Sequence, residues 1–371
     1  MDVSAVDIRA VARAAGVSTT TISHSLNDVG RISPATRERV RRIAAELGYA
    51  PNILARGLRR QRSETIGLLG DEIVTTPFAG RIIAGAQEAA KAHGSLLLIF
   101  NTNGEPELEE REALLLKQRK VDGVLYAAMF HREVTIPTTL ADVPVVLVDA
   151  ISDDSSISSV VPDEVSGGRD AVILLLSAGH RRIGFLNGED DIPATHGRLK
   201  GFNEALAAAG IEPNGSHVLR VPATPEGGYQ GGLSLLQSPG RPTGVFCFTD
   251  RVAMGCYQAA AEVGLRIPDD LSIVGFDDLQ IISEGLRPGL TTIALPHFEM
   301  GAWAINRLYA ELDARSKGEV LPAEHLVLPG PVVRRSSVAP PPGSSLTGAD
   351  QITRTAARPA ARRPARSRQP K

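Results

Sequence analysis

The sequence predicts an α/β protein in which a small unit of three helices precedes two Rossmann-like lobes built on parallel sheets. Apolar residues recur at helical spacing between good capping residues through the first 48 positions. Strand-like and helix-like runs then alternate from residue 63 to 338, which is typical of parallel sheets covered by helices. The alternation restarts after about residue 160, which predicts two similar halves.

The composition narrows the class of protein. The 43% hydrophobic content over 371 residues is ordinary for a packed globular chain of two or three domains. No apolar run approaches the roughly 18–20 residues that span a bilayer, and no signal-peptide pattern opens the chain. We therefore expect a cytoplasmic protein with no membrane partner. The only two cysteines, Cys247 and Cys256, exclude a disulfide framework, and the scattered histidines predict no metal site.

The formal net charge of −2 conceals a strong asymmetry. Residues 1–62 carry 11 Arg against 5 acidic residues, a net of +6, and residues 339–371 carry 7 basic residues against one Asp, again +6. Subtracting both from −2 leaves −14 for residues 63–338. A basic head indicates a polyanionic partner. Arginine that merely solubilises a small helical domain would give the same charge.

Three helices are predicted in the head from their capping residues. Asp7 is a good N-cap for the first helix, and Gly16 suits the left-handed conformation that ends it. Ser18 caps the second helix, and Ser33 with the proline after it begins the third, which Gly48 closes. The tight turn between the first two predicts a helix-turn-helix, whose second helix enters the major groove of DNA. A small bundle with an ordinary solvated face remains the alternative.

Three blocks of the head closely resemble the DNA-binding headpiece of the LacI/GalR family, in the family's order and spacing. They are VARAAGVSTTTISHSLN at 11–27, ISPATRERV at 32–40 and ELGYAPNILA at 46–55. The resemblance implies that Thr19, Thr20 and His24 face bases. It implies that the following residues position the DNA backbone: Thr21, Ser23, Asn27, Thr36, Tyr49 and Asn52. The family usually has Arg where His24 stands, so we expect a different or less strict base preference there.

A short helix is predicted in the segment that joins head and body. Asn52 can cap it after a proline, but so short a helix is marginal unless it packs on a partner. The family resemblance implies that two such helices of a dimer pair in the minor groove, where Ala55 packs and Leu58 wedges a base step open. A flexible linker is the alternative. We therefore expect a helix-turn-helix domain at 1–48, a hinge at 49–62, a ligand-binding and dimerisation domain at 63–338 and a disordered basic tail at 339–371.

Polar residues follow several predicted strands of the body. Asp149, Asp250, Asp277 and Asp278 each come directly after an apolar run. In such folds a ligand binds at the carboxyl ends of the strands, here between two lobes. Carboxylates and an arginine such as Arg198 suit sugar hydroxyls. Each carboxylate accepts several hydrogen bonds, and the guanidinium group donates several. Any single aspartate could instead be a helix cap or a turn residue.

The body is similar to the family's two-lobed, type I periplasmic-binding-protein-like core. The matching stretches are GHRRI at 179–183, RLKGF at 198–202, IPDDLSIVGFDD at 267–278 and LTTI at 290–293. The resemblance places Asp149, Arg198 and Asp277 on the ligand. It puts Pro77 and Phe78 on the wall of the site. Two further ligand positions depart from the family: Thr249 stands where Asn is common, and His297 stands where some sugar-responsive members have an aromatic ring.

These observations predict a sequence-specific transcriptional regulator, a homodimeric repressor that binds a palindromic operator and is switched by a small effector, with a sugar favoured. A purine-type corepressor and a ligand-binding protein without operator function are the alternatives. No phosphate loop, nucleophile elbow or HExxH motif supports an enzyme, and no cofactor is expected. The tail, rich in Pro, Ala, Arg and Ser, cannot bury enough surface to fold; it is either inert or adds non-specific attraction to DNA.

Overall fold

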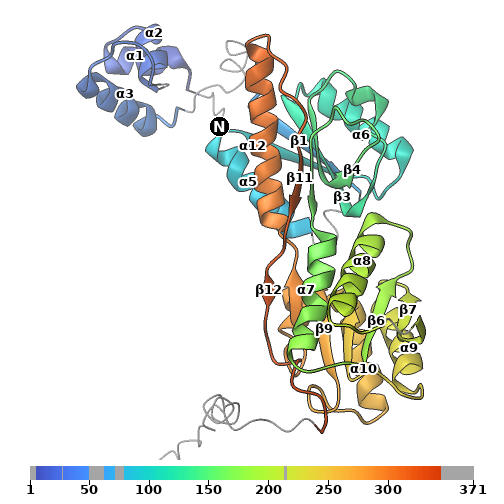
Figure 1. Ribbon diagram of the computed structural model, residues 1–371. Coiled ribbons are helices and arrows are strands. Elements are labelled where there is room, and N and C mark those ends of the chain that lie inside the picture. The colour runs from blue at the N-terminus through green and yellow to red at the C-terminus, as the bar shows by residue number, and fades with distance from the viewer. Residues whose placement is uncertain (1–5, 27, 50–61, 72–78, 213–214, 344–371) are drawn as a thin grey trace, which may run out of the picture.

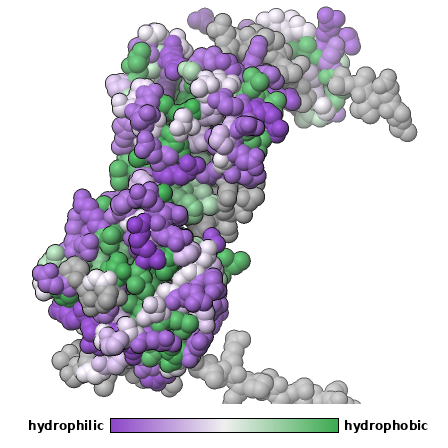
Figure 2. All heavy atoms as spheres, turned by 90° about the vertical axis from the view of Figure 1, so that its right-hand side faces the viewer, coloured by the Kyte–Doolittle hydropathy of each residue, from purple (hydrophilic) through white to green (hydrophobic). Residues whose placement is uncertain are grey.

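The computed structural model describes residues 6–26, 28–49, 62–71, 79–212 and 215–343 (Figure 1). These residues form a head of three helices and two lobes, each built on a six-stranded sheet. The α/β class and the two Rossmann-like lobes predicted from the sequence are confirmed. Figure 2 shows the lobes as two masses, one above the other. No helix within the described ranges is long and apolar enough to cross a lipid bilayer.

The head contains α1 (Ile8–Ala15), α2 (Thr19–Leu26) and α3 (Pro34–Glu46). Its core is small and apolar, with Val11, Ile22 and Val40 fully buried. The predicted caps are confirmed for α1: the Asp7 carboxylate accepts from the Ala10 amide at 2.8 Å, and Gly16 has a φ of +64°. A three-helix unit this small depends on such local devices, because it buries little apolar surface.

The first lobe has a wholly parallel sheet in the order β11-β5-β4-β3-β1-β2. Its strands are β1 (Thr65–Gly70), β2 (Leu96–Asn101), β3 (Gly123–Glu133), β4 (Val145–Ile151), β5 (Ser159–Pro162) and β11 (His325–Leu328). Its helices are α5 (Ala79–Ala92), α6 (Pro106–Gln118), η1 (Thr138–Leu140) and α12 (His297–Ser316). Neighbouring strand residues point to opposite faces, so Leu68 packs against α5 and α12 while Leu69 packs against α6.

The second lobe has the sheet order β12-β10-β9-β8-β6-β7, with only β12 antiparallel to its neighbour. Its strands are β6 (Ile183–Gly188), β7 (Val218–Val221), β8 (Gly244–Cys247), β9 (Ser272–Asp277), β10 (Thr291–Ala294) and β12 (Val332–Val333). Its helices are α7 (Glu164–Ser177), α8 (Pro193–Ala208), η2 (Gly215–His217), α9 (Pro225–Leu236), α10 (Asp250–Glu262) and α11 (Gln280–Ser283). Helices α7 and α8 cover one face of the sheet, and α9 and α10 cover the other.

The chain passes between the lobes three times, between β5 and α7, between β10 and α12, and between β11 and β12. The two lobes are therefore interleaved, whereas the sequence pattern predicts two successive halves. Helix α12 lies beside α5 in the first lobe (Figure 1). It returns there because Met300, Ala304 and Leu308 bury their side chains against α5 and the sheet.

The end of the body lies beyond the predicted start of the tail. The tail is expected from residue 339, yet Ala339 is buried, and its amide donates to the Ser272 hydroxyl at 3.0 Å. Its carbonyl accepts from His180 Nε2 at 2.9 Å and from the Ser272 hydroxyl at 3.0 Å. Ala339 thus belongs to the packed second lobe, and residues 344–371 lie outside the described residues.

Candidate functional site

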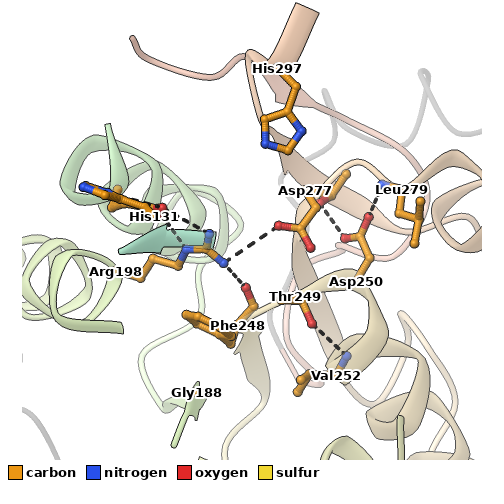
Figure 3. Close-up of polar contacts among 12 residues, drawn as sticks. His131, Gly188, Arg198, Phe248, Thr249, Asp250, Val252, Asp277, Leu279 and His297 are labelled. Atoms are coloured by element: carbon orange, nitrogen blue, oxygen red, sulfur yellow. Dashed lines mark hydrogen bonds and ion pairs between the residues drawn. The ribbon is translucent and has the colours of Figure 1, made fainter. Parts of the chain in front are cut away.

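Side chains from both lobes converge on one small cavity (Figure 3). The first lobe contributes Asp149 from β4 and His131 from the end of β3; the second contributes Arg198 and Asp277. Its other lining residues are Met129, Phe130, Glu164, Ala194, Thr249, Leu295 and His297. The cavity lies at the carboxyl ends of the strands, where the sequence predicts a ligand site.

Asp149 and His297 form the first-lobe side of the cavity. Their side chains are only 4% and 5% exposed, and His297 Nε2 lies 3.6 Å from Asp149 Oδ2. Asp149 Oδ1 and His297 Nε2 have no hydrogen-bond partner among the described residues. Buried polar atoms without partners are costly, so atoms of this kind that face a cavity indicate a ligand or water that completes them.

Arg198 lies on the opposite side, in a buried ion pair with Glu164. Its Nε donates to Glu164 Oε2 at 2.7 Å and its Nη2 to Glu164 Oε1 at 3.4 Å. Its Nη1 donates to the carbonyl of Phe248 and lies 3.9 Å from Asp277 Oδ1 (Figure 3). The guanidinium carbon is 4.4 Å from the ring centre of Phe248 and 3.7 Å from that of Phe276. Hydrogen bonds thus hold the edges of the guanidinium group, and the two aromatic rings cover its faces.

Asp277 ends β9 with a φ of +106°, a strained conformation for a residue with a side chain. Burial raises the pKa of its carboxyl well above the usual range, although the nearby Arg198 opposes this. Its Oδ2 atom has no hydrogen-bond partner within the described part of the chain. A ligand that donates a hydrogen bond here would satisfy the carboxyl in either protonation state, since a carboxyl keeps acceptor capacity when protonated.

The predicted ligand contact Thr249 has a structural role as well as a place in the cavity wall. It is the N-cap of α10, and its hydroxyl accepts from the Val252 amide at 3.2 Å. The next residue, Asp250, is fully buried behind the wall and accepts from the Leu279 amide and the Thr292 hydroxyl, both at 2.7 Å. Asp278 pairs with Arg335 at 2.7 Å. Of the four strand-end aspartates, only Asp149 and Asp277 therefore line the cavity.

Two ionisable lining residues, Glu164 and His131, were not predicted, nor were the apolar ones. Glu164 is the first residue of α7, whose N-cap Asp163 follows the short strand β5. His131 lies near the end of β3, beyond a shift in the register of β3 with β4. Its Nδ1 is 4.0 Å from Glu164 Oε1 and has no hydrogen bond among the described residues. Pro77 and Phe78, predicted for the wall, lie outside the described residues.

The second helix of the head presents the residues predicted to face bases. Thr19 and Thr20 are exposed on α2. His24 is half-buried, and its ring lies against Gly30, where a Cβ would come within 2.8 Å of Nδ1. His24 therefore also supports the loop after the helix. Asn27 lies outside the described residues.

The residues predicted to contact the DNA backbone are also engaged within the head. The hydroxyl of Thr21 is 2.9 Å from that of Ser18, and the hydroxyl of Thr36 is 2.8 Å from that of Ser33, so both belong to helix caps. Ser23 is half-buried, and Tyr49 packs against the core. Asn52, Ala55 and Leu58 lie outside the described residues.

The loop after α2 is held by charged contacts that were not predicted. Arg37 Nη1 lies 2.9 Å from the carboxylate of Asp28, and its Nη2 donates to the carbonyl of Gly30 at 2.9 Å. Arg41 also binds Asp28, at 2.6 Å. Asp28 and Gly30 both have positive φ values, so this turn needs support. The ion pairs join the loop after α2 to α3.

Comparisons with known proteins agree with both parts of the molecule. Residues 7–52 match the family model "Bacterial regulatory proteins, lacI family", and residues 172–338 match "Periplasmic binding protein-like domain". The chain is 34% identical to the HTH-type transcriptional regulator DegA of Bacillus subtilis, over 89% of this chain and 97% of that one. It is 36% identical to the ribose operon repressor of Haemophilus influenzae, over 80% of this chain and 89% of that one.

A solved structure extends the likeness to the whole architecture. The lac repressor dimer bound to operator and the anti-inducer ONPF is 26% identical, with a TM-score of 0.71 over 90% of this chain and 99% of that one. Its operator and its anti-inducer show that a protein of this architecture binds DNA and a small molecule. This chain belongs to the lacI family of bacterial regulatory proteins.

Proposed function

We propose that the chain is a sequence-specific transcriptional repressor whose affinity for operator DNA is controlled by a small effector, a sugar, bound between its lobes. One observation carries the proposal: buried polar atoms of Asp149 in one lobe and Asp277 in the other face the same cavity without partners among the described residues. A ligand with several hydroxyl groups can donate to both carboxyls at once. Such a ligand would bridge the lobes.

A ligand that binds both lobes can control the affinity of the protein for DNA by changing the arrangement of the lobes. An effector shifts a conformational equilibrium only by its difference in affinity for the two states. A ligand that reaches both Asp149 and Asp277 binds the closed arrangement of the lobes better than an open one, because an open arrangement separates the two contacts. We propose that closure alters the spacing of two hinges in a homodimer, and with it the fit of two heads to a palindromic operator. Whether closure releases or strengthens DNA binding depends on which spacing fits.

The DNA contacts are proposed for the head and the hinge, with the domain bounds predicted from the sequence. Domain 1–48 carries Thr19, Thr20 and His24 toward the bases. The positioning set is Thr21, Ser23, Asn27, Thr36, Tyr49 and Asn52. The hinge at 49–62 brings Ala55 and Leu58 to the minor groove. The exposed threonines of α2 support the first assignment, and the ion pairs of Asp28 support it by holding that helix in place.

The effector is tested by thermal unfolding of the full chain with a panel of sugars, nucleosides and nucleobases. A ligand at about 100 times its Kd adds about 2.7 kcal/mol to the free energy of unfolding, which is readily measured. We expect a sugar to stabilise the wild type and not the Asp149→Ala variant, which lacks the acceptor. Stabilisation by a nucleobase alone would show that the effector is of the purine type.

Repression is tested by a gel shift with palindromic operators, with and without the effector found. We expect binding to one operator sequence and a change in affinity when the effector is added. A chain that bound the sugar but no operator would be a ligand-binding protein, and the proposed function would be wrong. The relatives are named as regulators, and we propose no enzymatic activity.

A further inference from the structure

The cavity is lined by more carboxyl groups than permanent cations, which does not favour an anionic ligand. Of the described residues that line it, Asp149, Glu164 and Asp277 bear carboxyl groups, and Arg198 alone bears a group that is cationic at every physiological pH. Its two histidine side chains are charged only when protonated. The balance of fixed charge in the wall is therefore acidic.

The single arginine is already neutralised. Glu164 takes two of its donor groups in a fork, and both side chains are at most 5% exposed. The Phe248 carbonyl takes a third donor, and the rings of Phe248 and Phe276 cover the guanidinium faces. A phosphate or carboxylate ligand that took this fork of donors would have to displace Glu164, which would leave a buried carboxylate without its partner. One that used the two remaining N–H groups of Arg198 would meet a guanidinium whose charge Glu164 already balances.

The buried oxygen atoms without partners in the cavity also favour a ligand that donates hydrogen bonds. Asp149 Oδ1 and Asp277 Oδ2 are acceptors, and each lacks a hydrogen bond among the described residues. Hydroxyl groups can donate to them. Ionised phosphate oxygens cannot donate to Asp149, and they would add like charge beside Asp149 and Glu164.

We propose that Glu164, by neutralising Arg198, makes this cleft select uncharged polyols and exclude phosphorylated or otherwise anionic effectors. The inference rests on the proposed function in one respect, that the effector occupies this cleft. It adds a specificity-determining residue and a class of ligand, the free rather than the phosphorylated sugar.

The test is isothermal titration calorimetry of the full chain with named probes. They are inorganic phosphate and two matched pairs, ribose with ribose 5-phosphate and glucose with glucose 6-phosphate. We expect the wild type to bind the phosphorylated member of each pair at least about tenfold more weakly than the free sugar. We expect Glu164→Gln to bind inorganic phosphate at least about tenfold more tightly than the wild type, because Arg198 then lacks a counter-charge.

Two further variants separate the cleft from other cationic surfaces. Glu204→Gln removes a glutamate from α8 that pairs with Arg169 outside the cavity, and it should leave phosphate binding unchanged. The double variant Glu164→Gln/Arg198→Gln should lose the phosphate binding that Glu164→Gln gains. Circular dichroism checks that each variant keeps its fold; if Glu164→Gln unfolds, the wild-type comparison of free and phosphorylated sugars decides.

Two results would overturn the inference. One is tighter binding of a phosphorylated sugar than of its free partner by the wild type. The other is equal phosphate affinity of the wild type and a folded Glu164→Gln. If no sugar bound either protein, but phosphate bound Glu164→Gln alone and not the double variant, the sugar assignment would fail while the role of Glu164 stood.

Discussion

The dependence of stability on pH follows from Asp250, the fully buried first residue of α10. Burial raises the pKa of its carboxyl from 3.8 to about 7. The Thr292 hydroxyl and the Leu279 amide, which donate to it, oppose this rise, as does Arg335, while the neighbouring Asp278 adds to it. The folded protein therefore favours the protonated carboxyl up to a pH near neutrality.

The sign follows from the proton balance. The unfolded chain releases this proton near pH 4 and the folded chain near pH 7, so the folded state holds more protons between about pH 4 and 7. The contribution of Asp250 to the free energy of unfolding is thus fully present below about pH 4 and is lost as the pH rises to about 7. At about 1.4 kcal/mol for each pKa unit, the loss is on the order of 4 kcal/mol.

The assay is urea unfolding followed by circular dichroism, between about pH 4 and 8. Asp250→Asn cannot ionise and keeps an acceptor for the Leu279 amide, so its stability relative to the wild type should rise by several kcal/mol across this range. Thr292→Val removes a donor that stabilises the ionised form of Asp250, so it should raise the pKa of this carboxyl further. The free energy of unfolding should then continue to fall above about pH 7, where that of the wild type has levelled off. Parallel stability curves for the wild type and Asp250→Asn would refute the reasoning.

Three further changes test the packing of the lobes and the DNA contacts. Gly85→Ala should destabilise the protein by about 1–3 kcal/mol in urea unfolding, because its Cβ would lie 1.9 Å from the Phe298 carbonyl. Gly80→Ala on the same helix should not, because a Cβ there meets no atom of the described residues within 4 Å. Equal stability of the two variants would exclude the close contact. His24→Ala should change or relax the base preference in an operator selection; an unchanged preference would contradict base readout by His24. Leu58→Ser should weaken operator binding in a gel shift and spare effector binding in calorimetry; unchanged operator affinity would exclude the wedge.

The head could be predicted almost completely, because its features are local. Asp7, Gly16 and Ser33 each act within about four residues along the chain, and the structure places each one as a cap or a turn. What could not be predicted is the support for the loop after α2. That support pairs Asp28 with Arg37 and Arg41, and no periodic pattern marks such contacts.

The cavity could be predicted in part. Asp149 and Asp277 follow long apolar runs, so their place at the carboxyl edge of a sheet follows from the sequence. Glu164 follows β5, a strand of only four residues without a distinct pattern. Thr249 caps a helix at the same point where it lines the cavity, and residue type does not separate the two roles.

The glycines of α9 illustrate a second limit. The four glycines at 227–228 and 231–232 all lie buried within this helix. A Cβ at Gly228 would lie 2.1 Å from the carbonyl of Val252 on α10, and one at Gly232 would lie 2.8 Å from the Cβ of Ala259. The glycines let two helices approach closely. Sequence patterns find the face that a helix buries, but they do not give the distance to its neighbour.

The interleaving of the lobes gives the cavity a direct physical link to the proposed hinge. Helix α12 begins at His297 in the cavity, and Asp313 near its other end lies 2.7 Å from Arg62, the last residue of the proposed hinge. Strand β3 carries His131 into the same cavity, and Asp122, just before that strand begins, accepts from the amides of Ser63 and Glu64 at 2.6 and 2.9 Å. Packed helices and strands transmit displacement because close-packed interiors deform little. We therefore expect an effector that moves either histidine to act on Arg62, Ser63 and Glu64, which follow the proposed hinge or end it.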